Sequence, residues 1–229
     1  MRQSQKFGLS QESFKLIACV TMLIDHIGAV FFPPVMWLRI IGRVSFPIYC
    51  FLLVEGVHHT RSPLKYGLRL VLVALLAELP YDLLFYGRFT WLHNSVMVTL
   101  LLGFGAGTAM KYCPGWIKYL TPLPFLLAGR YLGGSYGMYG VAMVVMFLLA
   151  RDIPCQSIVR FLLMLLLSLR MAGFPERIGI QFYAVFAMIP IFFYSGEKRS
   201  RSKGLQWSFT LFYPAHMALL LLIRAIFLE

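Results

Sequence analysis

Residues 13–30 read SFKLIACVTMLIDHIGAV, an apolar run that is interrupted near its end by two ionisable residues, Asp25 and His26. The run is long enough for a helix that crosses a bilayer, because about 20 residues span the hydrocarbon core. An ionisable side chain inside that core costs about 2.5 to 3.5 kcal/mol on insertion scales. Two adjacent ionisable residues at such a depth make Asp25 and His26 the first candidates for a functional role.

The apolar character of this run extends over the whole chain. Of the 229 residues, 59% are hydrophobic and only 13% are charged, and the mean hydropathy is +0.75. Apolar segments of about 16 to 23 residues alternate with short polar or Gly/Pro-rich breaks, a pattern typical of a polytopic helical membrane protein. We therefore expect an all-α integral membrane bundle that forms one domain over residues 1–229.

The positions of the breaks predict nine membrane helices. These cover residues 12–32, 35–57, 64–86, 93–110, 116–132, 136–150, 155–171, 178–194 and 207–228. The fifth helix contains Pro122 and Pro124, which remove backbone donors and disturb a regular helix. A broken or re-entrant segment is therefore the alternative to a continuous fifth helix.

Basic residues are distributed unevenly between the two sets of breaks. When the breaks are assigned alternately to the two sides of the membrane, most of the 21 Lys and Arg residues fall on the side of the N-terminus. The positive-inside rule then places the N-terminus in the cytoplasm and the C-terminus outside. The net charge of +12 fits this topology, and we expect no nucleic-acid partner because the basic residues do not gather on one polar face.

Several charged residues lie inside the apolar segments: Asp25, Arg39, Arg43, Glu55, Glu78 and Asp82. Facing lipid, they would cost roughly 15 to 20 kcal/mol together, so we expect them to face the bundle interior or an aqueous cavity. Arg39 and Arg43 are four residues apart, share one helix face and enter the membrane from the side toward which Asp25 is displaced. An ion pair between Asp25 and Arg43 is therefore expected.

Other polar residues lie toward the same outer side or, in the case of His216, about mid-depth in the last predicted helix. We expect them to contribute to substrate binding, and they are Glu78, Asp82, His93, Asn94, Tyr139 and His216. No metal site is expected, because the histidines are on different helices and no H-x-x-x-H pair occurs. Structural ion pairs that only hold helices together are the alternative interpretation of the buried charges.

Short motifs along nearly the whole chain resemble the TraX family of conjugal-transfer membrane proteins. They are FKLIA (14–18), MxxDHIG (22–28), RIIGRxSFPI (39–48), FxxxEG (51–56), AExPYD (77–82), HN (93–94), YGxYG (136–140) and FYPxH (212–216). The resemblance implies a multi-pass protein of the bacterial inner membrane with an activity like that of an F-pilin N-acetylase. More distantly, the chain is similar to membrane acyltransferases that O-acetylate glycans, which implies an acyl-CoA donor and a histidine at the reaction centre.

The leading functional hypothesis is a membrane acetyltransferase that uses acetyl-CoA as co-substrate. Acyl transfer needs a base for the acceptor proton, a role that suits His26, and a positive group for the oxyanion, a role for Arg43 or Arg39. Asp25 would balance their charge. Cytoplasmic basic residues would attract the phosphates of acetyl-CoA, among them Arg61, Lys65 and the 198–203 loop.

The acceptor in this hypothesis is an amine or a hydroxyl at the outer side of the membrane. A pilin-like N-terminus, a glycan and a small molecule all remain open, and lipid surrounds the protein. The alternative function is a proton- or ion-coupled transporter, in which the same intramembrane Asp, His, Arg and Glu groups form a relay.

Overall fold

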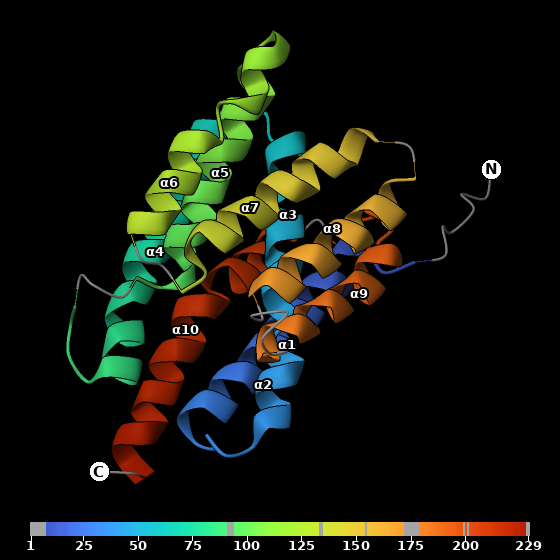
Figure 1. The fold of residues 1–229 in the computed structure, drawn as a ribbon. Coiled ribbons are helices and arrows are strands. Elements are labelled where there is room, and N and C mark those ends of the chain that lie inside the picture. The colour runs from blue at the N-terminus through green and yellow to red at the C-terminus, as the bar shows by residue number, and fades with distance from the viewer. Residues whose placement is uncertain are drawn as a thin grey trace.

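The structure is a computed structural model, and it describes residues 8–90, 94–132, 135–153, 155–171, 179–198, 200 and 202–227. Within these ranges the chain forms ten α-helices and three short 3-10 helices. Figure 1 shows how the labelled α-helices are arranged. One isolated bridge joins Leu9 and Tyr194, and the described residues form no β-strand. The predicted all-α class is therefore confirmed.

The elements follow one another closely along the chain. They are α1 (Gln11–Val30), α2 (Met36–Gly42), α3 (Ser45–His59), α4 (Pro63–Tyr86), α5 (Val96–Tyr112), η1 (Gly115–Tyr119), α6 (Leu123–Tyr131), α7 (Gly137–Leu149), η2 (Ala150–Asp152), α8 (Gln156–Met171), η3 (Ile180–Ala187), α9 (Met188–Phe192) and α10 (Lys203–Phe227). Within the described ranges, three stretches are long and apolar enough to cross a membrane, namely Gln11–Val30, Met36–His59 and Gly204–Phe227.

Helix α1 begins at a side-chain cap. Ser10 adopts an extended conformation, and its hydroxyl accepts a hydrogen bond from the Ser13 amide at 3.2 Å, which satisfies one of the free donors of the first turn. Buried residues then recur every three or four positions, from Phe14 through Ala18 and Met22 to Asp25. This periodicity places the Asp25 carboxylate on the helix face that packs into the protein.

The second predicted helix is divided into α2 and α3. Pro47 has no backbone donor, so it cannot pair with the carbonyl of Arg43 four residues earlier. The chain turns at Arg43 and Val44, and α3 starts at Ser45, whose hydroxyl donates to the carbonyl of Gly42 at 2.8 Å. The break places Arg43 at a joint between two helices.

Two other predicted helices also differ from a regular α-helix. In the fifth, η1 is followed by a separate helix α6 of nine residues. At the helical rise α6 is about 14 Å long, too short to cross a hydrocarbon core of about 30 Å. The broken alternative for this segment is therefore correct. The eighth segment is a 3-10 helix, η3, that passes into the short α9.

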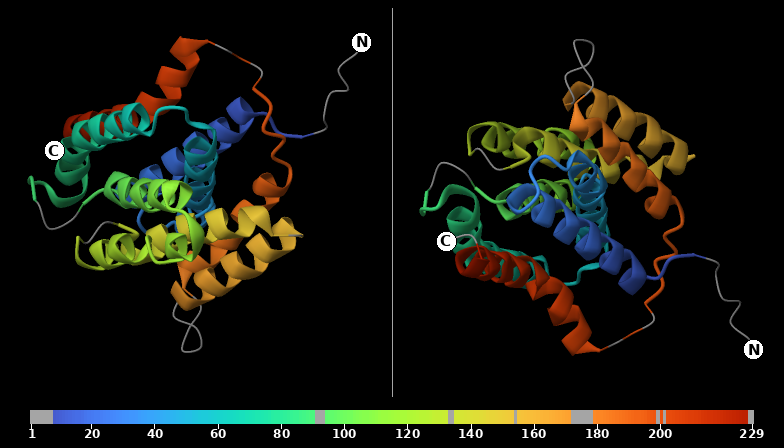
Figure 2. Two further views of the ribbon diagram at one scale, coloured as in Figure 1. Left: turned by 90° about the horizontal axis from the view of Figure 1, so that it is seen from above. Right: turned by 90° about the horizontal axis from the view of Figure 1, so that it is seen from below.

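The helices form a bundle around a core that contains Phe14, Phe51, Phe147, Met143 and Met217. Figure 2 shows α4 and α10 packed side by side along one flank, while α1 and α3 run through the middle. Helices α5, α6 and α7 pack against one another on another flank. The contact of α1 with α10 brings together the two ends of the chain, and α1 also packs against α2, the helix that follows it.

Candidate functional site

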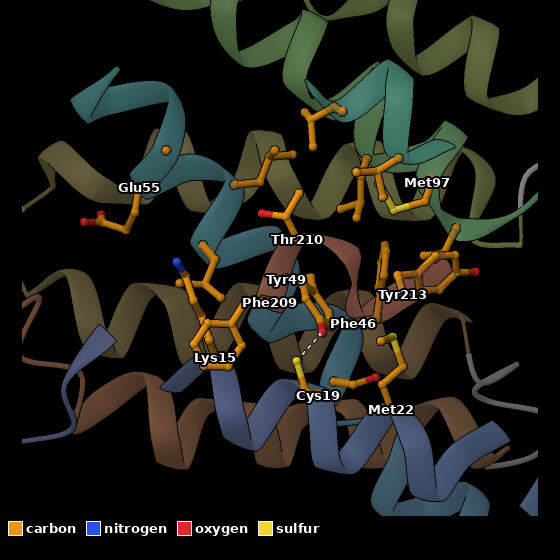
Figure 3. A pocket seen from close by; sticks show the side chains of 18 of the residues that line it. Lys15, Cys19, Met22, Phe46, Tyr49, Glu55, Met97, Phe209, Thr210 and Tyr213 are labelled. Atoms are coloured by element: carbon orange, nitrogen blue, oxygen red, sulfur yellow. Dashed lines mark hydrogen bonds between the residues drawn. The ribbon is translucent and has the colours of Figure 1, made fainter. Parts of the chain in front are cut away.

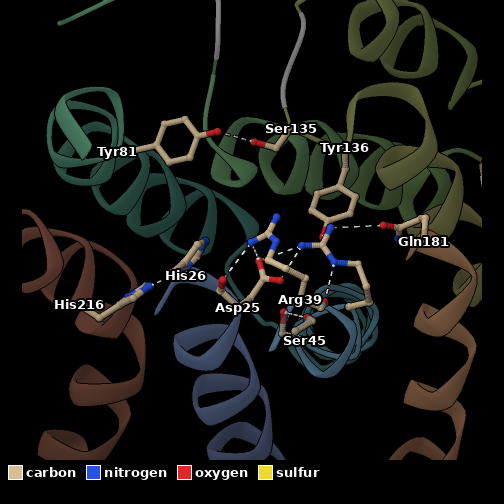
Figure 4. A network of polar contacts seen from close by, with 11 residues as sticks. Asp25, His26, Arg39, Ser45, Tyr81, Ser135, Tyr136, Gln181 and His216 are labelled. Atoms are coloured by element: carbon tan, nitrogen blue, oxygen red, sulfur yellow. Dashed lines mark hydrogen bonds and ion pairs between the residues drawn. The ribbon is translucent and has the colours of Figure 1, made fainter. Parts of the chain in front are cut away.

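Asp25 binds Arg39 of α2 and Arg43, the residue that follows α2. Figure 4 shows Asp25 facing Arg39 in this network. Its Oδ1 accepts from Arg43 Nη2 at 2.7 Å, and its Oδ2 accepts from Arg39 Nη1 at 2.8 Å and from Arg43 Nη2 at 2.9 Å. The predicted Asp25–Arg43 pair is thus confirmed, and Arg39 joins it. We call Asp25, Arg39 and Arg43 the buried charge cluster. It contains two guanidinium groups for one carboxylate, and therefore one positive charge in excess.

A glycine permits this approach of α1 and α2. A Cβ atom on Gly42 would lie 2.1 Å from Oδ1 of Asp25 and 2.2 Å from its Cβ. Real Cβ atoms do not come so close to other heavy atoms, so any side chain at Gly42 would displace the carboxylate. The R-x-x-G-R spacing thereby supplies both the guanidinium groups and the space for their shared partner.

Arg43 extends the network into the second half of the chain. Its Nη1 donates to the Tyr136 hydroxyl at 3.3 Å and to Oε1 of Gln181 at 3.4 Å. Gln181 Nε2 in turn donates to the hydroxyl of Tyr139 at 3.3 Å, so Tyr139 is connected to the cluster through Gln181. The sequence analysis missed Gln181, although a lone polar residue in the apolar run 178–194 is a signal that could have identified it.

The two histidines expected in the site are in direct contact. His26 Nδ1 lies 2.9 Å from His216 Nε2, and the two rings are stacked with centroids 5.1 Å apart. His216 is buried, with 4% of its surface exposed, and its Nδ1 lies 2.7 Å from the carbonyl oxygen of Phe212. His26 is half-buried and faces a cavity that His216 does not line. The two histidines are 190 residues apart in sequence, and their contact joins α1 to α10.

The acids of α4 contact loops and helix ends near the cluster. Glu78 accepts from the Ser95 amide at 3.2 and 3.1 Å and from the Ser95 hydroxyl at 2.6 Å, at the start of α5. Asp82 is fully buried, and its Oδ2 accepts from the amide of Thr90 at 2.9 Å. Neither acid lines the cavity described below. Both connect α4 to the chain that follows it.

Asn94 also makes a loop contact, because its side-chain nitrogen donates to the carbonyl of Leu132. Its own carbonyl accepts from the amide of Ser135 at 3.2 Å, and the Ser135 hydroxyl contacts that of Tyr81 at 2.9 Å. The loops before α5 and α7 are thereby tied to α4. His93, the remaining predicted residue, lies outside the described residues.

A cavity of about 880 Å³ leads away from the buried charge cluster. Its lining residues on α1 run from Gln11 to His26, which corresponds to about 22 Å at the helical rise. Figure 3 shows its middle part, where Met22, Phe46 and Tyr213 surround the space and Cys19 contacts the Tyr49 hydroxyl at 3.3 Å. The cavity is therefore long, and its middle is largely apolar.

The end of the cavity opposite the buried charge cluster is basic. Lys15, Arg69 and Lys198 line it, and Lys15 lies within electrostatic range of the other two. We call these three residues the basic end. Glu55 also lines this region, but its carboxylate is bound to Arg151, and it lies 3.4 Å from His59. The Glu55 carboxylate is thus already engaged, and Glu12 is a second acid within electrostatic range of Lys15. None of the three cations forms an ion pair with a carboxylate among the described residues.

The site therefore combines an imidazole, an excess positive charge and a cavity that reaches a second group of cations. This set can take up a proton, stabilise a negative charge that develops near the arginines, and hold an elongated anionic molecule. Among the described residues, no group of three or more His, Cys, Asp or Glu side chains is arranged to hold a metal ion.

Comparison with known proteins gives a consistent result. The model of the family described as TraX protein matches residues 10–224. A probable fimbrial assembly protein FimC, serogroup H1, of Dichelobacter nodosus is 30% identical over 239 residues, which cover 95% of this chain and 96% of that protein. Protein TraX of Escherichia coli is 27% identical over 139 residues, which cover 58% of this chain and 53% of that protein. No solved structure matches the chain.

Proposed function

This chain belongs to the TraX family, and from that premise we propose that it is an integral-membrane acetyltransferase. It would transfer an acetyl group from cytoplasmic acetyl-CoA to an amine or a hydroxyl at the outer side of the membrane. The observation that carries the proposal is that one cavity has the basic end on one side and His26 with the buried charge cluster on the other.

The chemistry at the cluster end follows from the residues present. The acceptor nitrogen or oxygen attacks the carbonyl carbon of the thioester while the His26 imidazole takes the acceptor proton. The C–S bond then breaks, and the leaving thiolate of CoA takes that proton and departs as the free thiol. A positioned base of this kind contributes about 10² to 10⁴-fold to the rate.

The arginines supply the stabilisation of the oxyanion. Their combined charge exceeds that of Asp25 by one, and Arg39 retains 28% of its side-chain exposure against 12% for Arg43. Arg39 is therefore the more accessible of the two to a substrate, while Arg43 is held by Tyr136 and Gln181. Fixed positive groups in a water-poor site stabilise such charge strongly because they need no reorganisation.

The basic end suits the donor. Acetyl-CoA carries its phosphates at one end and its thioester at the other, joined by the slender pantetheine arm. Lys15, Arg69 and Lys198 would attract the phosphates, and the largely apolar middle of the cavity would accept the arm. The thioester would then reach His26, which lies about 16 Å along α1 from Lys15 at the helical rise.

The proposed orientation places the basic end in the cytoplasm, in the inner membrane of a bacterium, with nine spanning segments, of which the fifth is formed by η1 and α6 together. The contacts between loops support this alternation. The start of α1 pairs with the 194–200 segment, Lys111 donates to the carbonyl of His58, and Ser135 meets Asn94 at the opposite end. In each case the two breaks are ones that the charge pattern assigns to the same side.

A topology experiment tests this orientation. Tags at the N-terminus and within residues 196–204 should be accessible only from the cytoplasm, and a tag after Glu229 only from outside. A C-terminal tag found in the cytoplasm of an otherwise intact protein would contradict the nine-span arrangement.

The acceptor is proposed from the family and from the names of the relatives. One relative is described as a fimbrial assembly protein and another as TraX, so an exported pilin-like N-terminus is the first acceptor to test. The chemistry of the cluster serves a hydroxyl of a glycan or a small molecule equally well, since only the acceptor proton needs to reach His26.

Binding of acetyl-CoA to the purified protein tests the function directly. An acetyltransferase should be stabilised against thermal unfolding by acetyl-CoA and should hydrolyse it slowly in the absence of acceptor. A proton- or ion-coupled carrier, the alternative function, should show neither effect. The variant His26→Ala should keep the stabilisation and lose the hydrolysis.

A further inference from the structure

The two histidines form a chain of hydrogen bonds that ends on the protein backbone. His216 Nδ1 lies 2.7 Å from the carbonyl oxygen of Phe212, and His216 Nε2 lies 2.9 Å from Nδ1 of His26. A carbonyl oxygen only accepts hydrogen bonds, so Nδ1 of His216 must carry a proton. The direction of the remaining contact then depends on whether His216 is neutral.

Burial favours the neutral form of the His216 imidazole. His216 is 4% exposed, and its ring is packed against the rings of Phe212, at 4.9 Å, and Tyr213, at 5.5 Å. Arg39 and Arg43 of the buried charge cluster lie within electrostatic range of His26, and this cluster is already positive in sum. A second positive charge on a buried imidazole without a carboxylate partner is strongly disfavoured.

A neutral His216 with its proton on Nδ1 has a bare Nε2, which accepts the Nδ1 proton of His26. The bare nitrogen of His26 is then Nε2. His26 lines the cavity and His216 does not. Figure 4 shows the two rings facing each other from α1 and α10. The geometry thus gives the imidazole on the cavity wall one defined tautomer.

Asp25 cannot serve as the partner of His26. Both of its oxygens are occupied by Arg39 and Arg43 at 2.7 to 2.9 Å. Adjacent residues of a helix also project about 100° apart, so the carboxylate points away from the imidazole of its neighbour. His216, from the other end of the chain, occupies the place that a carboxylate has in catalytic triads.

We propose that His216 is a positioning residue that fixes the tautomer of His26, so that Nε2 of His26 is the atom that accepts the proton of the acceptor. This inference rests on the proposed acetyltransferase function. When His26 gains a proton at Nε2, its Nδ1–H remains bound to Nε2 of His216, and the imidazolium keeps its orientation until the CoA thiolate removes that proton. His216 itself neither gains nor loses a proton in the reaction.

Two substitutions at one position separate the positioning role from packing. His216→Phe keeps a ring of similar shape but removes the acceptor, and kcat should fall roughly 10 to 100-fold, the usual cost of losing a partner that orients a reactive group. His216→Gln places an amide oxygen near the position of Nε2 and should recover kcat to within about tenfold of wild type. The KM for acetyl-CoA should change less than about twofold in both variants, because His216 does not line the cavity.

The tautomer can be read without activity, by ¹⁵N NMR of histidine-labelled protein with the His26 signals assigned from His26→Ala. Wild-type protein should show a protonated Nδ1 and a bare Nε2 at His26, and His216→Phe should show a mixture of both tautomers. His58→Phe, the same change at an exposed histidine outside the cavity, should leave the His26 signals and kcat unaltered.

Wild-type protein with the proton of His26 on Nε2, or an unchanged tautomer in His216→Phe, would overturn the assignment. Equal kcat loss in His216→Phe and His216→Gln would also overturn it, since packing alone would then explain the effect. If wild-type protein shows the expected tautomer but neither binds nor uses acetyl-CoA, the proposed function fails while the hydrogen-bond assignment stands.

Discussion

The two ends of the cavity both contain arginine or lysine side chains, but their surroundings differ. In the buried charge cluster, Arg43 is 12% exposed and every oxygen of Asp25 is engaged. At the basic end, Arg69 and Lys198 are exposed, and no ion pair of Lys15, Arg69 or Lys198 with a carboxylate occurs among the described residues.

The comparison shows how burial changes what a charge can do. Removing one partner of a buried ionic group costs about 3 to 5 kcal/mol because the other partner is left without compensation. An exposed charge contributes about 0 to 1 kcal/mol to stability and remains free for a ligand. Variants of the cluster should therefore change stability and catalysis, whereas variants of the basic end should change only donor binding.

The largest effect is expected for Asp25→Ala. It removes the one carboxylate of the cluster and leaves Arg39 and Arg43 as uncompensated neighbours, at a cost of about 3 to 5 kcal/mol. Thermal unfolding of the purified protein in detergent measures the loss. Arg43→Ala should cost less, because Arg39 still pairs with Asp25. If Asp25→Ala were as stable as wild type, the charges of the buried charge cluster would contribute no more to stability than those of the basic end.

The next effect is on the reaction and not on the fold. His26→Ala should lower acetyl transfer roughly 10² to 10⁴-fold, the usual contribution of a general base, while expression stays near wild type. Its imidazole is half-buried and carries no ion pair, so its removal leaves no charge without a partner. Turnover within tenfold of wild type would exclude His26 as the base.

A smaller effect is expected for Gly42→Ala, which tests the approach of α1 to α2. The added methyl group would meet Asp25 at 2.1 Å, and overpacking of this kind costs about 1 to 3 kcal/mol. Gly204→Ala is the matched control, because a Cβ there meets only the Ser202 hydroxyl, at 3.7 Å. If the two variants unfold at the same temperature, the close packing of Asp25 against Gly42 does not contribute to the stability of the protein.

The smallest effects are expected at the basic end. Lys15→Ala and Arg69→Ala should each raise the KM for acetyl-CoA about two- to fivefold, in a manner that weakens with salt, and should leave kcat and stability near wild type. Lys118→Ala, a cation on η1 outside the cavity lining, is the control. A fall in kcat without a change in KM would assign the basic end a role other than donor binding.

Much of this arrangement could be predicted from the sequence. Hydrophobic runs with capping and breaking residues predict the helices, and the cost of a charge in hydrocarbon predicts that Asp25 pairs with Arg43. Pro122 and Pro124 similarly indicate that the fifth segment is broken. Each of these predictions depends either on residues that are close in sequence or on the cost of a charge in hydrocarbon, which few arrangements of the side chains can avoid.

Other features could not be predicted, because they depend on packing between distant segments. The contact of His26 with His216 requires α10 to lie against α1, and no local pattern specifies that neighbour. Glu78 and Asp82 are predicted to contribute to substrate binding. Their side-chain oxygens bind backbone amides of the α4–α5 connection instead of lining the cavity. Periodicity predicts which face of a helix is buried but not which group it meets there.

The central claim is that one cavity connects a cytoplasmic donor to an acceptor on the outer side. Sealed right-side-out membrane vesicles that hold labelled acetyl-CoA inside test it most directly, with a membrane-impermeant amine or peptide supplied outside and vesicles carrying His26→Ala as the control. We predict that label appears on the external acceptor only when the donor is inside and the protein carries His26. Labelling that requires donor and acceptor on the same face of the membrane would contradict this mechanism, even if the protein transfers acetyl groups.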